Sequence, residues 1–156
     1  MKPVFRISRA SFPPEKFEAV RTSFEASRAT LDPATRRLRY VNAGHNPQFL
    51  LRAAGGIQPL SSTGLPIALY SGQGYKEASV QIGRGDLLFF YTDGLVETEN
   101  ERDEMFGADR LQSLLEAEHS HGIDMVLERV EQSVRDFRGK AEPFDDATMM
   151  ALRIEE

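Results

Sequence analysis

The sequence contains no cysteine among its 156 residues. This absence excludes disulfide bonds, thiolate metal sites and cysteine nucleophiles, and it is typical of a cytoplasmic protein. The chain also lacks a basic excess, because 24 Asp and Glu outweigh 19 Lys and Arg and give a formal net charge of −5. Proteins that bind nucleic acid usually present a basic surface. We therefore expect no nucleic acid among the partners.

Long apolar runs are missing as well. No segment approaches the roughly 20 apolar residues that a membrane-spanning helix needs, and the first residues have no apolar core of signal-peptide length. Glycine-rich phosphate loops and the Gly-x-Ser-x-Gly elbow of serine hydrolases are also absent. The missing apolar segments predict a cytoplasmic domain that does not contact a membrane, and the missing motifs argue against these two classes of enzyme.

The remaining pattern predicts an α+β fold. Hydrophobic residues make up 40% of the chain and charged residues 28%, which is ordinary for one globular domain of this length. Alternating apolar residues and turn formers predict a hairpin and then strands, over residues 23–41, 48–52, 75–82, 87–91 and 149–154. Helical spacing predicts helices after Gly107 and from Ile123 to about Arg138, and Pro14 at a first helical turn predicts a short helix over 15–21. Strands, two clear helices and a last strand indicate a mostly antiparallel sheet.

Two acidic segments lie next to predicted strands. Asp93 and Gly94 follow the apolar run Leu87–Tyr91 after a single threonine, and Asp145 and Asp146 lie two residues before the final strand. Carboxylates at strand ends suit hard cations such as Mg²⁺ or Mn²⁺, because these ions prefer oxygen ligands. Asp and Gly are also common turn residues. On position alone, turns and a metal site are both consistent with these segments.

Other polar features favour simpler interpretations. His45 lies in the turn-rich segment Asn42–Pro47 without a second metal ligand at suitable spacing, so we expect hydrogen bonds to hold it. The acidic residues between Glu97 and Glu104 lack the glycine and the ligand spacing of a calcium-binding loop. We expect a solvated acidic loop there.

Five segments occur in one order along the chain: YVNAGHNPQFLLR, TGLPIAL, GDLLFFYTDGLVETEN, FG and DDATMMALR. Together they closely resemble the later part of the PPM-type, metal-dependent protein serine/threonine phosphatases. The nearest branch is that of the bacterial sporulation stage II E (SpoIIE)-like phosphatases, which act in partner-switching control of sigma factors. The resemblance divides the chain into an unassigned segment, 1–21, and the C-terminal part of a phosphatase domain, 22–156.

The resemblance implies a partial α-β-β-α sandwich and a dinuclear Mn²⁺ or Mg²⁺ site. Asp93 matches the metal ligand of the Thr-Asp-Gly motif, and Gly94 follows it where little side-chain bulk is tolerated. Asp145 matches the ligand of the Asp-Asp-x-Thr motif, with Asp146 as the less favoured choice. Two metal ions roughly 4 Å apart would clamp the phosphate and activate water, so no side chain of the protein is expected as the nucleophile. The implied substrate is a phosphorylated regulatory protein of the anti-sigma-factor antagonist type.

The sequence also departs from the family pattern at one point. Members carry Gly-Asp-x-x-Asp-like and Asp-Val-Ser-Gly-His-Gly segments that supply further metal ligands, whereas the first aspartate here is Asp32. Two carboxylates do not balance the charge of two divalent ions. We therefore expect impaired hydrolysis by this chain alone, with a non-catalytic, protein-binding remnant as the alternative. Exposed sheet edges would also permit self-association.

Overall fold

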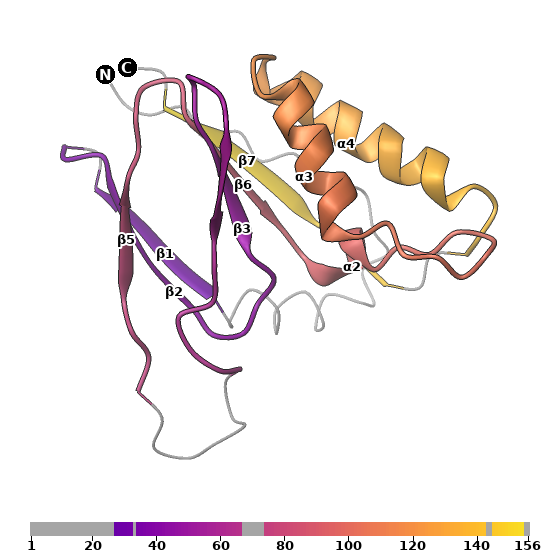
Figure 1. Ribbon diagram of the computed structural model, residues 1–156, viewed down its shortest axis with the longest axis horizontal. Helices are drawn as coiled ribbons and strands as arrows, with labels where there is room; N and C mark the ends of the chain where they lie inside the picture. Colours follow the sequence, from indigo (N-terminus) through magenta and orange to yellow (C-terminus); the bar gives the residue numbers. More distant parts are fainter. Residues whose placement is uncertain (1–26, 33, 67–73, 143–144, 155–156) are drawn as a thin grey trace.

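Three layers of secondary structure make up the described part of the molecule (Figure 1). The computed structural model describes residues 27–32, 34–66, 74–142 and 145–154. A three-stranded sheet has the order β1-β2-β5, and a four-stranded sheet has the order β4-β3-β6-β7. All of their strand pairs are antiparallel. The predicted α+β class with mostly antiparallel strands is thus confirmed.

The strands and helices alternate little along the chain. The strands are β1 (Ser27–Asp32), β2 (Arg37–Asn42), β3 (Gln48–Leu51), β4 (Ile57–Leu60), β5 (Ala78–Gln81), β6 (Leu87–Tyr91) and β7 (Met149–Arg153). The helices are α2 (Asp93–Val96), α3 (Ala108–Glu118) and α4 (Ile123–Arg138). In these ranges no helix combines the length and the apolar character needed to cross a membrane.

Strand β6 is apolar along its whole length because both of its faces are covered. Leu87, Phe89 and Tyr91 belong to the core between the four-stranded sheet and the helices. Leu88 and Phe90 belong to the second core, between the two sheets. A strand that is buried on both faces needs no polar alternation, which explains the continuous run of apolar residues.

Helices α3 and α4 cover the outer face of the four-stranded sheet (Figure 1). Helix α4 spans the residues predicted from its apolar spacing, and it ends where Gly139 adopts a φ of 61°. Phe106 precedes α3 and packs edge-on against Phe137 of α4, with ring centroids 5.4 Å apart. The predicted helical pattern after Gly107 is therefore confirmed, with Phe106 outside the helix.

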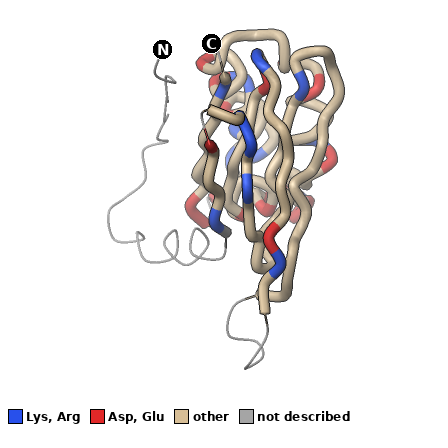
Figure 2. The backbone as a smooth tube through the Cα atoms, turned by 90° about the vertical axis from the view of Figure 1, so that its left-hand side faces the viewer, with Lys and Arg blue, Asp and Glu red and all other residues tan. Residues whose placement is uncertain are grey.

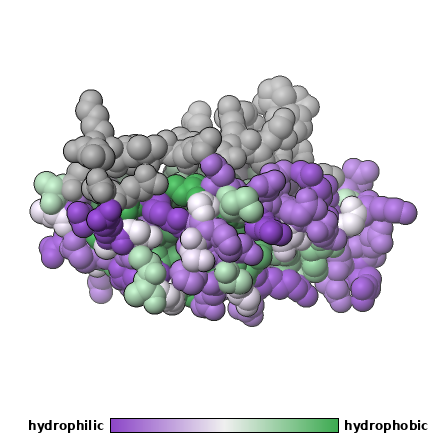
Figure 3. Space-filling model, turned by 90° about the horizontal axis from the view of Figure 1, so that it is seen from above, coloured by the Kyte–Doolittle hydropathy of each residue, from purple (hydrophilic) through white to green (hydrophobic). Residues whose placement is uncertain are grey.

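The outer face of the three-stranded sheet is polar. In β2, the side chain of Leu38 is buried between the sheets, whereas Arg37 and Arg39 on either side of it are exposed. Basic positions follow the strands of this face (Figure 2). Seen from above, hydrophilic residues cover much of the described surface, with apolar residues scattered among them (Figure 3).

Some local predictions differ from the structure or lie beyond its described part. The strand predicted over 75–82 is shorter and becomes β5. Asp93 does not lie in a simple turn after β6, because it begins the short helix α2. The helix predicted over 15–21, the segment 1–21 and the first residues of the predicted hairpin fall outside the described residues.

Candidate metal centre

Asp93 follows the end of β6 after a single extended residue. Thr92 is the N-cap of α2 with a φ of −94° and a ψ of 162°, and Asp93 is the first helical residue. The Asp93 side chain is half-buried, and its Oδ1 accepts a hydrogen bond from the Gly94 N–H at 3.0 Å. The central strand of a buried sheet therefore holds the backbone of this carboxylate at the molecular surface.

The segment with Asp145 and Asp146 is bound to the same strand end. The Thr92 N–H donates to the Thr148 carbonyl at 3.0 Å, and the Thr148 N–H donates to Thr92 Oγ1 at 2.9 Å. The Thr92 hydroxyl in turn donates to the Asp146 carbonyl at 3.3 Å. These three bonds bring together two acidic segments that lie more than 50 residues apart in the sequence.

Gly94 makes the contact between the two segments closer still. A Cβ atom at this position would lie 2.5 Å from the Asp146 carbonyl oxygen and 2.9 Å from its carbonyl carbon. Because both of these are backbone atoms, a side chain at position 94 would force the segments apart. Close packing of the two acidic segments therefore requires glycine at position 94.

The carboxylates of Asp93 and Asp145 are held in the same way. Asp145 Oδ1 accepts the Asp146 N–H at 2.7 Å, as Asp93 Oδ1 accepts the N–H of the residue that follows it. Among the described residues, the second oxygen of each carboxylate has no hydrogen-bond partner. Asp146 is more deeply buried, with 7% of its surface exposed, than the half-buried Asp145. One oxygen of Asp93 and one of Asp145 are thus unengaged within this part of the chain.

The donor chemistry fits a hard divalent cation, whereas the number of donors fits only part of a coordination shell. Carboxylate oxygens are the preferred protein ligands of Mg²⁺ and suit Mn²⁺. Within the ranges that the structure describes, however, no group of three or more His, Asp or Glu side chains is arranged to hold a metal ion.

The turn that contains His45 lies next to this strand end, connected through Gln48. The buried Gln48 amide nitrogen lies 2.9 Å from His45 Nδ1 and 3.0 Å from the Asn46 carbonyl oxygen. The Gln48 amide also contacts the backbone of Tyr91. The prediction that hydrogen bonds hold His45 is confirmed. Gln48 had no signal in the sequence beyond its position at the start of an apolar strand.

The same turn packs against the Thr63–Pro66 segment. Gly44 has a φ of +81°, and a Cβ there would lie 2.5 Å from Pro66 Cδ. Its N–H donates to Ser62 Oγ at 3.2 Å, and Ala43 forms a parallel bridge with Gly64. The bridge between Ala43 and Gly64 joins two segments that the sequence resemblance had connected only by their order.

Tyr91 lies directly before Thr92 and does not provide an acid or a base at neutral pH. Its ring stacks on Phe49 with centroids 5.8 Å apart, inside the core under the helices. Burial raises the pKa of the Tyr91 hydroxyl to about 12. The hydroxyl therefore stays protonated in the range in which most enzymes work.

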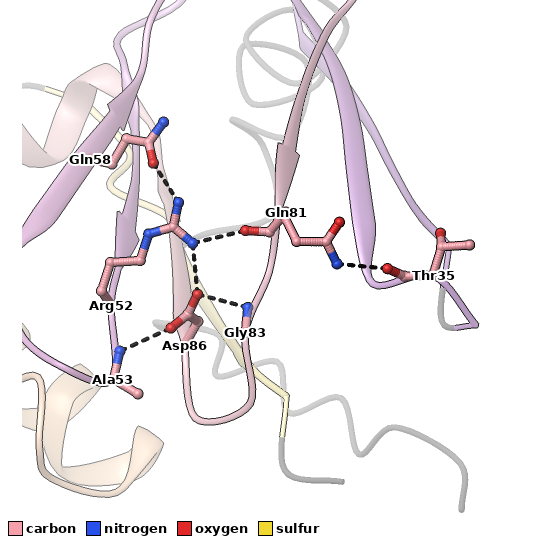
Figure 4. A network of polar contacts seen from close by, with 7 residues as sticks. All are labelled: Thr35, Arg52, Ala53, Gln58, Gln81, Gly83 and Asp86. Carbon is pink, nitrogen blue, oxygen red and sulfur yellow. Dashed lines mark hydrogen bonds and ion pairs between the residues drawn. The ribbon is translucent and has the colours of Figure 1, made fainter.

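The opposite end of β6 is preceded by another aspartate, Asp86, which is buried. Its Oδ1 accepts the Ala53 N–H at 2.9 Å, and its Oδ2 accepts the Gly83 N–H at 2.8 Å. Arg52 forms an ion pair with Oδ2 at 2.9 Å (Figure 4). Only 5% of the Asp86 surface is exposed. The local sequence gave no sign of this ion pair.

The bonds of Asp86 and Arg52 connect both sheets. Arg52 Nη1 also donates to the Gln81 carbonyl at 2.8 Å, and the Gln81 amide donates to the Thr35 carbonyl at 2.7 Å. Burial alone would raise the pKa of Asp86. The Ala53 and Gly83 N–H groups and the Arg52 guanidinium outweigh it and hold that pKa below its ordinary value.

The acidic stretch after α2 is a structured loop with exposed carboxylates. Asn100 Oδ1 accepts the N–H groups of Arg102 and Glu104, at 2.9 and 3.1 Å. Glu101 and Asp103 are exposed to solvent. The loop is thus organised by an asparagine side chain, and its exposed acids agree with the predicted solvated acidic loop.

Known proteins share both the sequence pattern and the fold. The profile of the family described as Stage II sporulation protein E (SpoIIE) matches residues 14–155. Protein IcfG of Synechocystis is 32% identical over 122 residues, which cover 78% of this chain and 19% of that protein. The chain therefore spans about a fifth of the length of this relative.

Solved structures match the same part of the chain. The SiaA PP2C domain of Pseudomonas aeruginosa has a TM-score of 0.72 at 19% identity, and covers 83% of this chain and 51% of that one. The phosphatase domain of SpoIIE from Bacillus subtilis, presoaked with manganese, has a TM-score of 0.64 at 16% identity, with coverages of 83% and 56%. The fold is thus that of a PPM-type phosphatase domain, of which this chain covers a part. Since the family profile matches most of its residues, the chain belongs to the SpoIIE family.

Proposed function

We propose that this chain carries one part of the metal site of a protein phosphatase that hydrolyses phosphoserine or phosphothreonine in a regulatory protein. One observation carries the proposal: the Asp146 carbonyl accepts the Thr92 hydroxyl and lies where a Cβ of Gly94 would be, which joins the two acidic segments. Membership of the SpoIIE family supports the reaction class.

In this proposal, Asp93 and Asp145 bind Mn²⁺ or Mg²⁺ through their unengaged oxygens. Asp146 and Gly94 act through the backbone contact that sets the spacing of the two segments. A divalent ion, when bound, supplies positive charge for the phosphate and lowers the pKa of water. The protein's part is to hold the two carboxylates in place before the ion arrives, and the bonds of Thr92 do this from within the sheet.

We expect the reaction to be impaired in this chain alone. Two or three carboxylates leave a dinuclear site of the family type short of anionic ligands, and Mg²⁺ binds weakly to so few. The described residues contain no larger group of candidate ligands. Further carboxylates from outside the described part would be needed to complete the site.

The proposed substrate is a phosphorylated regulatory protein of bacterial partner-switching signalling, of the anti-sigma-factor antagonist type. A solved structure of RsbU and RsbW domains from a Mycobacterium tuberculosis protein has a TM-score of 0.65 with this chain at 24% identity. That likeness and the family membership support a signalling role with a protein as the substrate.

Hydrolysis of p-nitrophenyl phosphate or of a phosphoprotein with Mn²⁺ tests the assignment of Asp93. We expect Asp93→Asn to lower metal-dependent turnover at least about 100-fold, because the substitution removes an anionic ligand. Asp103→Asn is the matched control, since it removes an exposed carboxylate from the nearby acidic loop. Metal-dependent turnover that is indifferent to Asp93→Asn would contradict the proposed role.

A second candidate function is that of a non-catalytic module that binds a regulatory protein. The shortage of grouped ligands in the described residues favours it. Calorimetry with Mn²⁺ distinguishes the two: tight binding of two ions per chain argues against a non-catalytic module. Absence of heat at millimolar Mn²⁺ argues for it.

A further inference from the structure

The hydrogen-bond ladder between β3 and β6 ends before it reaches Tyr91. Phe49 pairs with Phe89, and Leu51 pairs with Leu87. Each step back along β3 is one step forward along β6, so this register would place Pro47 opposite Tyr91. Proline has no N–H to donate. The backbone of Tyr91 therefore lacks a normal ladder partner on the β3 side, two residues before Asp93.

The side chain of Gln48 takes the place of that missing backbone partner. Its Oε1 accepts the Tyr91 N–H at 2.9 Å, and its Nε2 lies 3.4 Å from the Tyr91 carbonyl oxygen. The amide oxygen thus takes the acceptor place of an opposing residue. The amide nitrogen has two hydrogens for three acceptors, and the Tyr91 carbonyl is the most distant of these. Gln48 is 5% exposed, so water does not readily replace these bonds.

The orientation of this amide is itself determined by the preceding turn. Gln48 Nε2 also approaches His45 Nδ1 and the Asn46 carbonyl, at 2.9 and 3.0 Å. The Asn46 carbonyl only accepts hydrogen bonds, so it directs the nitrogen of the amide toward the turn. His45 Nδ1 is a second acceptor in the tautomer that is protonated at Nε2, and in the other tautomer it donates to the same Asn46 carbonyl, 3.0 Å away. The amide oxygen is then left facing the Tyr91 N–H.

The opposite side of the strand end is held by β7. Tyr91 pairs with Met149, and the Thr92 N–H donates to the Thr148 carbonyl at 3.0 Å. Gln48 on one side and Thr148 on the other therefore fix the two residues that precede Asp93. Without Gln48, the backbone groups of Tyr91 would lose their partners on one side, and buried unpaired groups favour rearrangement.

We propose that Gln48 is a positioning residue for Asp93, acting through the backbone of Tyr91, with His45 orienting its amide. Gln48 does not contact the proposed metal or the phosphate. Its effect is to restrict Asp93 to the geometry that a cation needs. The metal part of this inference rests on the proposed function, whereas the restriction of Asp93 does not.

The test compares Gln48→Met with the wild-type chain by nuclear magnetic resonance. Methionine preserves length and volume but removes both amide groups. Three-bond couplings to the Asp93 carboxyl carbon report the side-chain rotamer without metal, and Mn²⁺ broadening of the Gly94 amide signal reports binding. Gln81→Met is the matched control, because Gln81 also donates to a backbone carbonyl but lies in β5 of the other sheet.

We expect the Asp93 couplings of Gln48→Met to take rotamer-averaged values. We also expect the Mn²⁺ concentration that broadens the Gly94 signal by half to rise about tenfold, which is the usual effect of losing a hydrogen bond that supports a metal ligand. Gln81→Met should change neither. Unchanged Asp93 couplings in Gln48→Met, even with lower thermal stability, would overturn the inference and leave Gln48 a purely structural residue.

The experiment also separates the positioning role of Gln48 from the proposed metal role of Asp93. If the wild-type Gly94 signal is not broadened by Mn²⁺ while the Asp93 couplings respond to Gln48→Met, the proposed metal role fails and the positioning role holds. If Gln48→Met does not fold, His45→Ala takes its place, since this half-buried ring contacts the same amide. The expected change is then smaller and in the same direction, and unchanged Asp93 couplings would again overturn the inference.

Discussion

Strand β6 has an aspartate near each end, and the structure treats the two in opposite ways. Asp86 accepts two backbone N–H groups, pairs with Arg52 and is almost fully buried. Asp93 is half-buried and accepts one bond, from the N–H of its own neighbour. A carboxylate whose bonds are all satisfied within the protein stabilises the fold, and one with an unengaged oxygen can bind a ligand.

The difference follows from the neighbours of each end. At the Asp86 end, three backbone and side-chain donors surround the carboxylate, from the two residues after β3 and from the turn after β5 (Figure 4). At the Asp93 end, the side chains of Gln48 and Thr92 use their hydrogen bonds on the backbone. The strand end is held firmly there while the carboxylate remains available.

The same substitution at the two ends provides the largest expected contrast. Asp86→Asn should lower the free energy of unfolding by about 3 kcal/mol, because it breaks the ion pair between the buried Asp86 carboxylate and the half-buried Arg52. Asp93→Asn should change it by less than about 0.5 kcal/mol, as is usual at sites without buried partners. Urea unfolding of the two variants measures both values. Equal losses would refute the division into a structural and an available aspartate.

The contact between Gly94 and Asp146 predicts a somewhat smaller effect. Gly94→Ala should destabilise the fold by about 2 kcal/mol, because its Cβ would meet backbone atoms that cannot move aside alone. Gly74→Ala is the control, since no atom lies within 4 Å of a Cβ at that position. Thermal unfolding of both variants measures the difference. A Gly94→Ala variant as stable as the control would mean that the two acidic segments are not in contact.

The smallest expected effect is the share of the pH dependence of stability that Asp86 contributes. Its pKa in the folded protein is lower than the ordinary value of 3.8, so its ionised form stabilises the fold above about pH 4. That contribution is lost as the pH falls below 3.8 and through the lowered pKa. Unfolding of the wild type between pH 5 and pH 2 should therefore show a steeper loss of stability than unfolding of Asp86→Asn. Parallel curves would argue against a lowered pKa.

Much of the secondary structure was predictable because its signals are local. The apolar run Leu87–Tyr91 predicted β6, and the spacing from Ile123 to Arg138 predicted α4, with the boundaries that the structure has. The short helix α2 was missed because four residues give too little periodicity to distinguish a helix from a turn. The predicted domain boundary at residue 22 and the roles of Asp93, Gly94, Asp145 and Asp146 as a metal site stay predictions.

The local sequence determined which residues could provide ligands and which strands would be buried. Asp93 and Asp145 were identifiable because carboxylates beside apolar strands are conspicuous, and the strands themselves follow from residue-by-residue preferences. Only the tertiary structure decided that the two acidic segments touch, that Gln48 takes the place of a backbone partner for Tyr91, and that Asp86 is paired with Arg52. Each of these is a contact between residues more than 30 positions apart. Such contacts depend on strand register and packing, which local sequence preferences do not specify.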